Sequence, residues 1–149
     1  METLRASASM PFASKPVEIN GKKYLDGGVT DSIPFEKFAE MGYEKQVVIL
    51  TRDMSYRKKP MNGALISLFY RKYPEFRRRL KNRHIVYNES VHKLAELEKA
   101  GSVFVIRPSV PIEISRTERE PERLKQVYAL GRADAERELE RLEKYLGEQ

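Results

Sequence analysis

Two short apolar runs, separated by a long stretch of helical pattern, constrain the fold more than any other feature of this sequence. The runs are residues 47–50 (Val-Val-Ile-Leu) and 103–106 (Val-Phe-Val-Ile), and neither alternates apolar with polar residues. Unalternated runs of this kind are typical of strands that are covered on both faces of a parallel sheet. A strand, a helical crossover and a second strand make a βαβ unit, so the sequence predicts an α/β fold.

The stretch between the runs has apolar residues at helical spacing, broken once. Leu65, Phe69, Tyr73, Phe76 and Leu80 recur every three or four residues, and Pro74 predicts a break or kink among them. Helical pattern returns in residues 109–149. With 149 residues, no internal repeat and no low-complexity linker, we expect a single domain over residues 1–149.

A turn signal near the N-terminus predicts a hairpin over residues 17–25. Asn20-Gly21 supplies the two positive φ values of a type I′ turn. The hairpin leads into Asp26-Gly27-Gly28, a carboxylate followed by two glycines. One interpretation is an Asx turn, in which Asp26 only shapes the backbone. The other is a general base whose glycine neighbours let a further chain segment approach the carboxylate.

Composition excludes several kinds of site. The chain has no Cys and two His, His84 and His92, which excludes disulfides, thiolate sites and a histidine-only metal centre. We therefore expect no metal and no cofactor. No apolar run approaches the ~18 residues of a membrane span, and the N-terminus lacks a signal-peptide core, so we expect a cytoplasmic protein.

A set of short motifs, in a fixed order, resembles the second half of a patatin-like phospholipase domain. The motifs are Arg5-Ala6-Ser7-Ala8-Ser9-Met10-Pro11-Phe12, Pro16-Val17, Tyr24-Leu25-Asp26-Gly27-Gly28-Val29 and Pro34. The resemblance is best over residues 1–108, with residues 109–149 as a C-terminal helical extension. It implies part of a three-layer α/β/α sandwich with a mostly parallel sheet, a β-hairpin and C-terminal helices.

The same resemblance implies a chemistry. Patatin-like enzymes are serine lipid acyl hydrolases with a Ser-Asp dyad, and Asp26 matches the dyad Asp, with Gly27 and Gly28 as its backbone setting. None of the eight glycines brackets a serine in a G-x-S-x-G motif, and no glycine-rich oxyanion loop occurs. We expect the chain to act on a lipid or acyl ester only with a missing N-terminal half, and to be inactive alone.

Residues 71–83 hold seven basic residues against one acidic residue, in a chain of net charge +6. A solvated helix face explains such a segment. The functional alternative is a module that binds anionic membrane surfaces, which would place the protein peripherally on a membrane. Nucleic acid is a weaker alternative, because no nucleic-acid-binding signature accompanies the charge. The basic residues are Arg71, Lys72, Arg77, Arg78, Arg79, Lys81 and Arg83.

A parallel sheet without its neighbouring strands would expose unpaired backbone groups and apolar side chains. For that reason we also expect the chain to self-associate.

Overall fold

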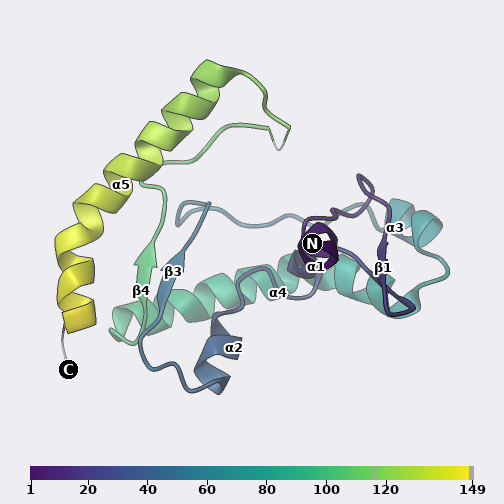
Figure 1. Ribbon diagram of the computed structural model, residues 1–149, viewed down its shortest axis with the longest axis horizontal. Coiled ribbons are helices and arrows are strands. Elements are labelled where there is room, and N and C mark those ends of the chain that lie inside the picture. Colours follow the sequence, from purple (N-terminus) through teal and green to yellow (C-terminus); the bar gives the residue numbers. More distant parts are fainter. Residues whose placement is uncertain (116, 148–149) are drawn as a thin grey trace. The chain divides into compact units, whose positions relative to one another are not determined.

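The computed structural model describes residues 1–115 and 117–147, and it confirms the predicted α/β class. It contains an antiparallel hairpin, a parallel strand pair and long helices, and the three-layer sandwich that the resemblance implies stays a prediction. The elements, drawn in Figure 1, are α1 (Glu2–Ser7), β1 (Val17–Ile19), β2 (Lys22–Tyr24), the 3₁₀ turn η1 (Gly27–Val29), α2 (Phe35–Glu40), β3 (Val47–Ile49), α3 (Gly63–Phe69), α4 (Pro74–Lys99), β4 (Phe104–Ile106) and α5 (Pro121–Gly147).

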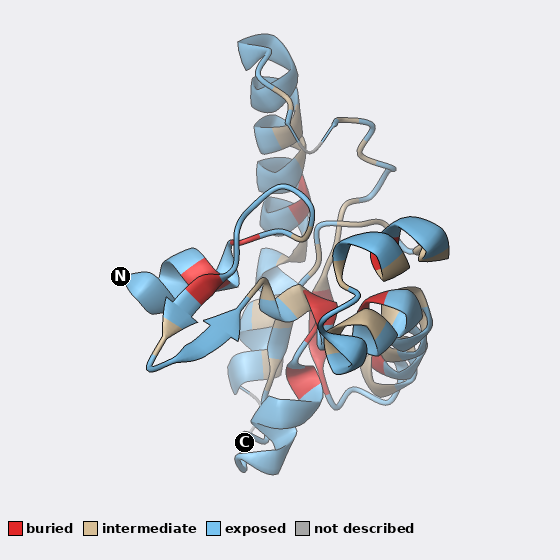
Figure 2. Cartoon of the chain, turned by 90° about the vertical axis from the view of Figure 1, so that its right-hand side faces the viewer, coloured by how far each residue is buried: buried red, intermediate tan, exposed pale blue. Residues whose placement is uncertain are grey.

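The residues group into two compact units. The first unit is Met1–Pro34 with Arg57–His92, and the second is Phe35–Tyr56 with Lys93–Gln149. Buried residues form short segments within mostly exposed helices and strands, as Figure 2 shows. Both units contain buried hydrophobic residues. The single-domain organisation stays a prediction.

The hairpin of the first unit forms as the turn signal predicts. β1 and β2 pair antiparallel, with Val17 opposite Tyr24. Asn20 has φ 50° and Gly21 has φ 73°, the left-handed conformations that a type I′ turn needs. The hairpin then delivers the chain directly into η1, so this local signal places the Asp-Gly-Gly sequence.

The core of the first unit lies beneath η1. Val29, Ile66 and Leu80 are buried together, and the rings of Tyr70 and Phe76 pack against them. Helix α3 ends at Phe69 and α4 begins at Pro74, which confirms the predicted break. Only one side of α3 faces this core, because Ile66 is fully buried while its neighbour Leu65 is exposed.

The parallel pair of the second unit confirms the pairing of the two apolar runs but corrects their predicted burial. Val47 lies opposite Phe104, and Ile49 lies opposite Ile106. In β4, Phe104 and Val105 are buried, whereas in β3 Val47 is 39% and Ile49 is 72% exposed. The prediction that both runs are covered on both faces is therefore wrong for β3. Side chains of a strand point to the two faces of the sheet, so their burial needs other elements packed over those faces, and the exposure of Val47 and Ile49 shows that their face of β3 is not covered.

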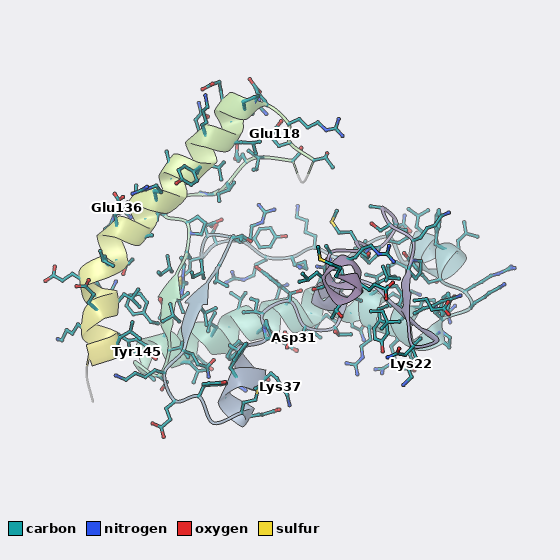
Figure 3. All side chains as sticks on the ribbon, in the orientation of Figure 1. Lys22, Asp31, Lys37, Glu118, Glu136 and Tyr145 are labelled. Atoms are coloured by element: carbon teal, nitrogen blue, oxygen red, sulfur yellow. The ribbon has the colours of Figure 1, made fainter. Side chains whose placement is uncertain are left out.

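Helix α5 is attached to the strand pair through Tyr145, which is labelled in Figure 3. The Tyr145 hydroxyl accepts a hydrogen bond from the Gln46 backbone N–H at 3.1 Å and donates one to the Ser102 carbonyl oxygen at 3.2 Å. Its ring lies 5.6 Å from the Phe104 ring, centre to centre. One side chain thus holds the segments that lead into both strands.

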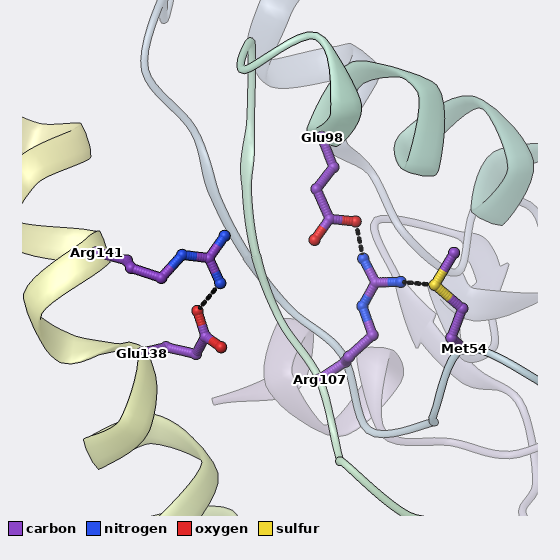
Figure 4. A network of polar contacts seen from close by, with 5 residues as sticks. All are labelled: Met54, Glu98, Arg107, Glu138 and Arg141. Carbon is purple, nitrogen blue, oxygen red and sulfur yellow. Dashed lines mark hydrogen bonds and ion pairs between the residues drawn. The ribbon is translucent and has the colours of Figure 1, made fainter.

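A second attachment within this unit follows β4 (Figure 4). Arg107 forms an ion pair with Glu98 and donates to the Met54 sulfur at 2.8 Å. On α5, Arg141 pairs with Glu138 at 2.6 Å. The Arg107 side chain is largely buried, so its guanidinium links the end of α4 to the segment after β3.

Asp134 is a buried carboxylate on α5 with a structural role. Its side chain is 4% exposed, Oδ2 accepts from the Ser109 N–H at 2.9 Å, and Arg137 Nη1 lies 3.0 Å from Oδ1 as an ion pair. Burial raises the pKa of Asp134, but the Ser109 N–H and the Arg137 guanidinium outweigh it and hold this pKa below its ordinary value. The charged form is therefore the one that stabilises the fold.

We expect Asp134→Asn to lower the free energy of unfolding by about 1–3 kcal/mol near neutral pH, because a buried charged hydrogen bond is lost. Because the pKa of Asp134 is lower in the folded state than in the unfolded state, its charge stabilises the fold at pH values above the unfolded pKa of about 3.9. This contribution is lost as the pH falls through the folded-state pKa. Urea unfolding should thus show a gap between wild type and variant that closes in acid. Glu136→Gln, on an exposed side chain of the same helix, is the control. Equal stabilities at neutral pH would contradict the prediction.

In the described part of the chain, no helix combines the length and the apolar composition that crossing a bilayer requires.

Candidate functional site

Asp26 caps the turn that follows the hairpin. It is the N-cap of η1, and its Oδ1 accepts a hydrogen bond from the Gly28 N–H at 2.7 Å. Its own N–H donates to the Ser9 carbonyl oxygen at 2.9 Å, which ties the turn to the segment that follows α1. The Asx-turn interpretation of the Asp-Gly-Gly sequence therefore holds, and it fixes the carboxylate at a defined position.

The capping role leaves part of the Asp26 carboxylate available for chemistry. The residue is half-buried rather than enclosed in the core. Among the described residues, the one hydrogen bond to its side chain comes from Gly28, and it goes to Oδ1. Oδ2 can therefore accept a proton from a hydroxyl supplied to this face, as a general base must.

Gly28 is the most crowded position of the turn. Its carbonyl oxygen accepts from Arg83 Nε at 2.6 Å and from the Ser32 hydroxyl at 2.7 Å. A methyl group added at Gly28 would lie 3.0 Å from Asp26 Oδ1 and 3.3 Å from Arg83 Nη2. A methyl group at Gly27 would meet no atom within 4 Å. The second glycine of the motif is thus the one at which an added methyl group would press on its neighbours.

No serine hydroxyl of the described residues donates to Asp26. The buried Ser9 hydroxyl donates to the Arg5 carbonyl oxygen at 2.7 Å, and the Ser32 hydroxyl bonds Gly28. Each of these two hydroxyls therefore donates to a backbone carbonyl oxygen rather than to a carboxylate. The general-base role of Asp26 stays a prediction, because neither hydroxyl is hydrogen-bonded to its carboxylate.

The basic segment does not form one uniform surface. Arg83 is half-buried and turned to the Asp-Gly-Gly turn, and Arg78 pairs with Glu75 at 2.7 Å. Arg77 is also half-buried. The exposed members besides Arg78 are Arg71, Lys72, Arg79 and Lys81. Binding of an anionic surface by this segment stays a prediction.

The contacts of Ser32 and Arg83 with the Asp-Gly-Gly turn are features that sequence reasoning missed, since it named Arg83 only as part of the basic segment. The Ser32 hydroxyl donates to the Gly28 carbonyl oxygen at 2.7 Å, while Asp31 accepts from the Ile33 N–H at 3.1 Å just before α2. Arg83 lies 55 residues from Gly28 in the chain, and no sequence signal connects the two.

Within the described residues, no three His, Asp or Glu side chains converge in a way that could hold a metal ion.

Comparison with known families divides the chain into two matched stretches. The family model described as Patatin-like phospholipase matches residues 1–39, which include the whole Asp-Gly-Gly turn. The family model described as a domain of unknown function (DUF6363) matches residues 73–147, which include α4, β4 and α5. The first match confirms the resemblance found in the sequence, and its predicted extent over residues 1–108 stays a prediction.

A curated relative carries a similar stretch. The chain is 40% identical over 52 residues to the Uncharacterized protein YjjU of Escherichia coli (strain K12). This match covers 34% of the chain and 15% of that protein, so the chain spans a small part of its relative.

Proposed function

Because the chain belongs to the family described as a domain of unknown function (DUF6363), and because its first residues match the patatin-like phospholipases, we propose that it supplies the general base of a serine lipid acyl hydrolase. The base is Asp26. The observation that carries the proposal is the Asp26 carboxylate itself, fixed through Oδ1 by the Gly28 N–H and half-exposed at the surface. The nucleophile and the oxyanion donors come from outside these 149 residues.

In the proposed reaction Asp26 accepts a proton in two steps, first from the serine hydroxyl and later from water. A serine hydroxyl transfers its proton to Asp26 as its oxygen bonds to the ester carbonyl carbon. When the tetrahedral intermediate collapses, the ester C–O bond breaks and the departing alcohol takes the proton back from Asp26. Water then attacks the acyl-serine with the same proton transfers, which releases the carboxylic acid and restores the serine.

The test compares the activity of the chain alone with that of a reassembled enzyme. The reassembled enzyme is a fusion in which a patatin-like segment with a G-x-S-x-G motif and an oxyanion loop precedes these 149 residues. We expect the chain alone, freed of contaminating esterase, to release no chromophore from a nitrophenyl acyl ester. We expect the reassembled enzyme to release it, and the added segment alone to be inactive. Ester hydrolysis by the chain alone would contradict the proposal. So would the absence of hydrolysis by a folded reassembled enzyme.

A second candidate function rests on one specific surface of the first unit. On α3, Leu65, Leu68 and Phe69 are 49%, 68% and 64% exposed, and the exposed Arg71 and Lys72 follow directly. Apolar side chains next to cations match the chemistry of an anionic lipid surface, where each basic residue contributes about 1 kcal/mol.

Vesicle flotation tests this candidate. The chain should float with vesicles that contain phosphatidylserine and should not float with pure phosphatidylcholine vesicles. Replacing both Leu68 and Phe69 with serine should weaken the flotation. Binding to an oligonucleotide at the same salt concentration, without flotation, would favour nucleic acid instead.

A further inference from the structure

Arg83 is the residue outside the Asp-Gly-Gly motif with the most direct connection to it. Its Nε donates to the Gly28 carbonyl oxygen at 2.6 Å, and the side chain is half-buried although it comes from the most basic segment of the chain. On α4, Arg83 lies about one helical turn after the core residue Leu80 and about two turns after Phe76, which packs against that core. The helix that forms the core therefore also holds the turn.

Gly28 connects this contact to the candidate base. The Gly28 N–H donates to Asp26 Oδ1 at 2.7 Å, while the Gly28 carbonyl oxygen accepts from Arg83 and from Ser32. A group that moves the Gly28 backbone therefore moves the donor that orients the carboxylate. A charged hydrogen bond is about twice as strong as a neutral one, so Arg83 is the stronger of the two donors to this oxygen.

The tight packing at Gly28 supports the same connection. The point at which a methyl group would sit lies 3.0 Å from Asp26 Oδ1 and 3.3 Å from Arg83 Nη2. The carboxylate oxygen and the guanidinium thus face the same small space, and a side chain there fits only if one of these groups shifts by a few tenths of an ångström. A side chain at this position would push against both groups at once.

We infer that Arg83 is a positioning residue for Asp26. Arg83 holds Gly28 in the conformation that directs the Asp26 carboxylate toward the serine. The inference rests on the proposed function and adds a residue that no motif of the sequence supplies. It also separates Arg83 from the surface cations of the same segment, because its guanidinium is committed to the turn.

The first arm of the test needs no catalysis. In the 149-residue chain, amide hydrogen exchange at Gly28 should become at least about tenfold faster in Arg83→Met, because the turn opens more often. Arg83→Lys keeps a donor for the Gly28 carbonyl and should restore most of the protection. Lys59→Met, which removes an exposed cation of the same unit, should leave the exchange unchanged. Unchanged exchange in Arg83→Met, or an equal rise at every amide of the unit, would overturn the inference.

The second arm uses the reassembled enzyme. Arg83→Met should lower kcat by about tenfold or more with little change in KM, because a misaimed base affects the chemical step. Gly28→Ala should have an effect of the same kind, and the double variant should lose less than the product of the two single losses, because both act on one contact. Independent effects, or a change in KM alone, would count against positioning. If the Asp26→Asn variant keeps its activity, the proposed function is wrong, whereas the effect of Arg83 on amide exchange at Gly28 is unaffected.

Discussion

Replacing Asp26 with asparagine is expected to lower the turnover of the reassembled enzyme by about 10²–10⁴-fold, the usual contribution of a general base. Asparagine keeps an oxygen that can accept the Gly28 N–H, so the turn retains its 2.7 Å hydrogen bond. What it loses is the ability to take a proton from the serine at neutral pH. The rate of release of nitrophenol from a saturating acyl ester measures the effect as a fall in kcat.

Asp31 provides the matched control for this substitution. It lies five residues further along the chain, is exposed, and caps the Ile33 N–H at 3.1 Å with the same kind of Asx contact; it is labelled in Figure 3. Asp31→Asn removes the same charge and should keep turnover within about twofold of wild type, as surface changes usually do. Equal losses in the two variants would show that Asp26 acts only through the local charge or fold.

The parts of the fold that sequence could predict depend on local signals. Asn20 and Gly21 need only their own backbone preferences to make the hairpin turn, and Pro74 needs only its missing N–H to begin a new helix. Asp26 was likewise placed by the hairpin before it. In each case, the physical cause lies within a few residues of its effect.

The parts that sequence could not predict depend on partners far along the chain. The apolar pattern of residues 47–49 predicts a covered strand, but the burial of Ile49 depends on whether another element packs over its face of the sheet. The contact between Arg83 and Gly28 joins residues from a helix and a turn that share no pattern. Within a basic segment, the sequence does not distinguish an arginine exposed at the surface from one, such as Arg83, that is hydrogen-bonded to a distant turn.

The second large effect is expected in the core beneath the turn. Leu80 is 1% exposed and packs with Val29 and Ile66, and Val29 is the residue directly after Gly28. Leu80→Ala removes buried methyl groups and leaves a cavity, which costs about 2–5 kcal/mol of the free energy of unfolding. Against a typical total of about 5–15 kcal/mol, this is a large share. Urea unfolding followed by circular dichroism and tyrosine fluorescence measures the change.

Leu68→Ala tests whether the loss at Leu80 comes from burial rather than from the type of residue. Leu68 lies on α3 and is 68% exposed, so the same truncation should change the free energy of unfolding by no more than about 0.5 kcal/mol. Because Val29 rests on Leu80, the cavity should also speed amide exchange at Gly28 under conditions where the unit remains folded. A stable Leu80→Ala variant with a protected Gly28 would show that the turn is held without this core, by its polar contacts alone.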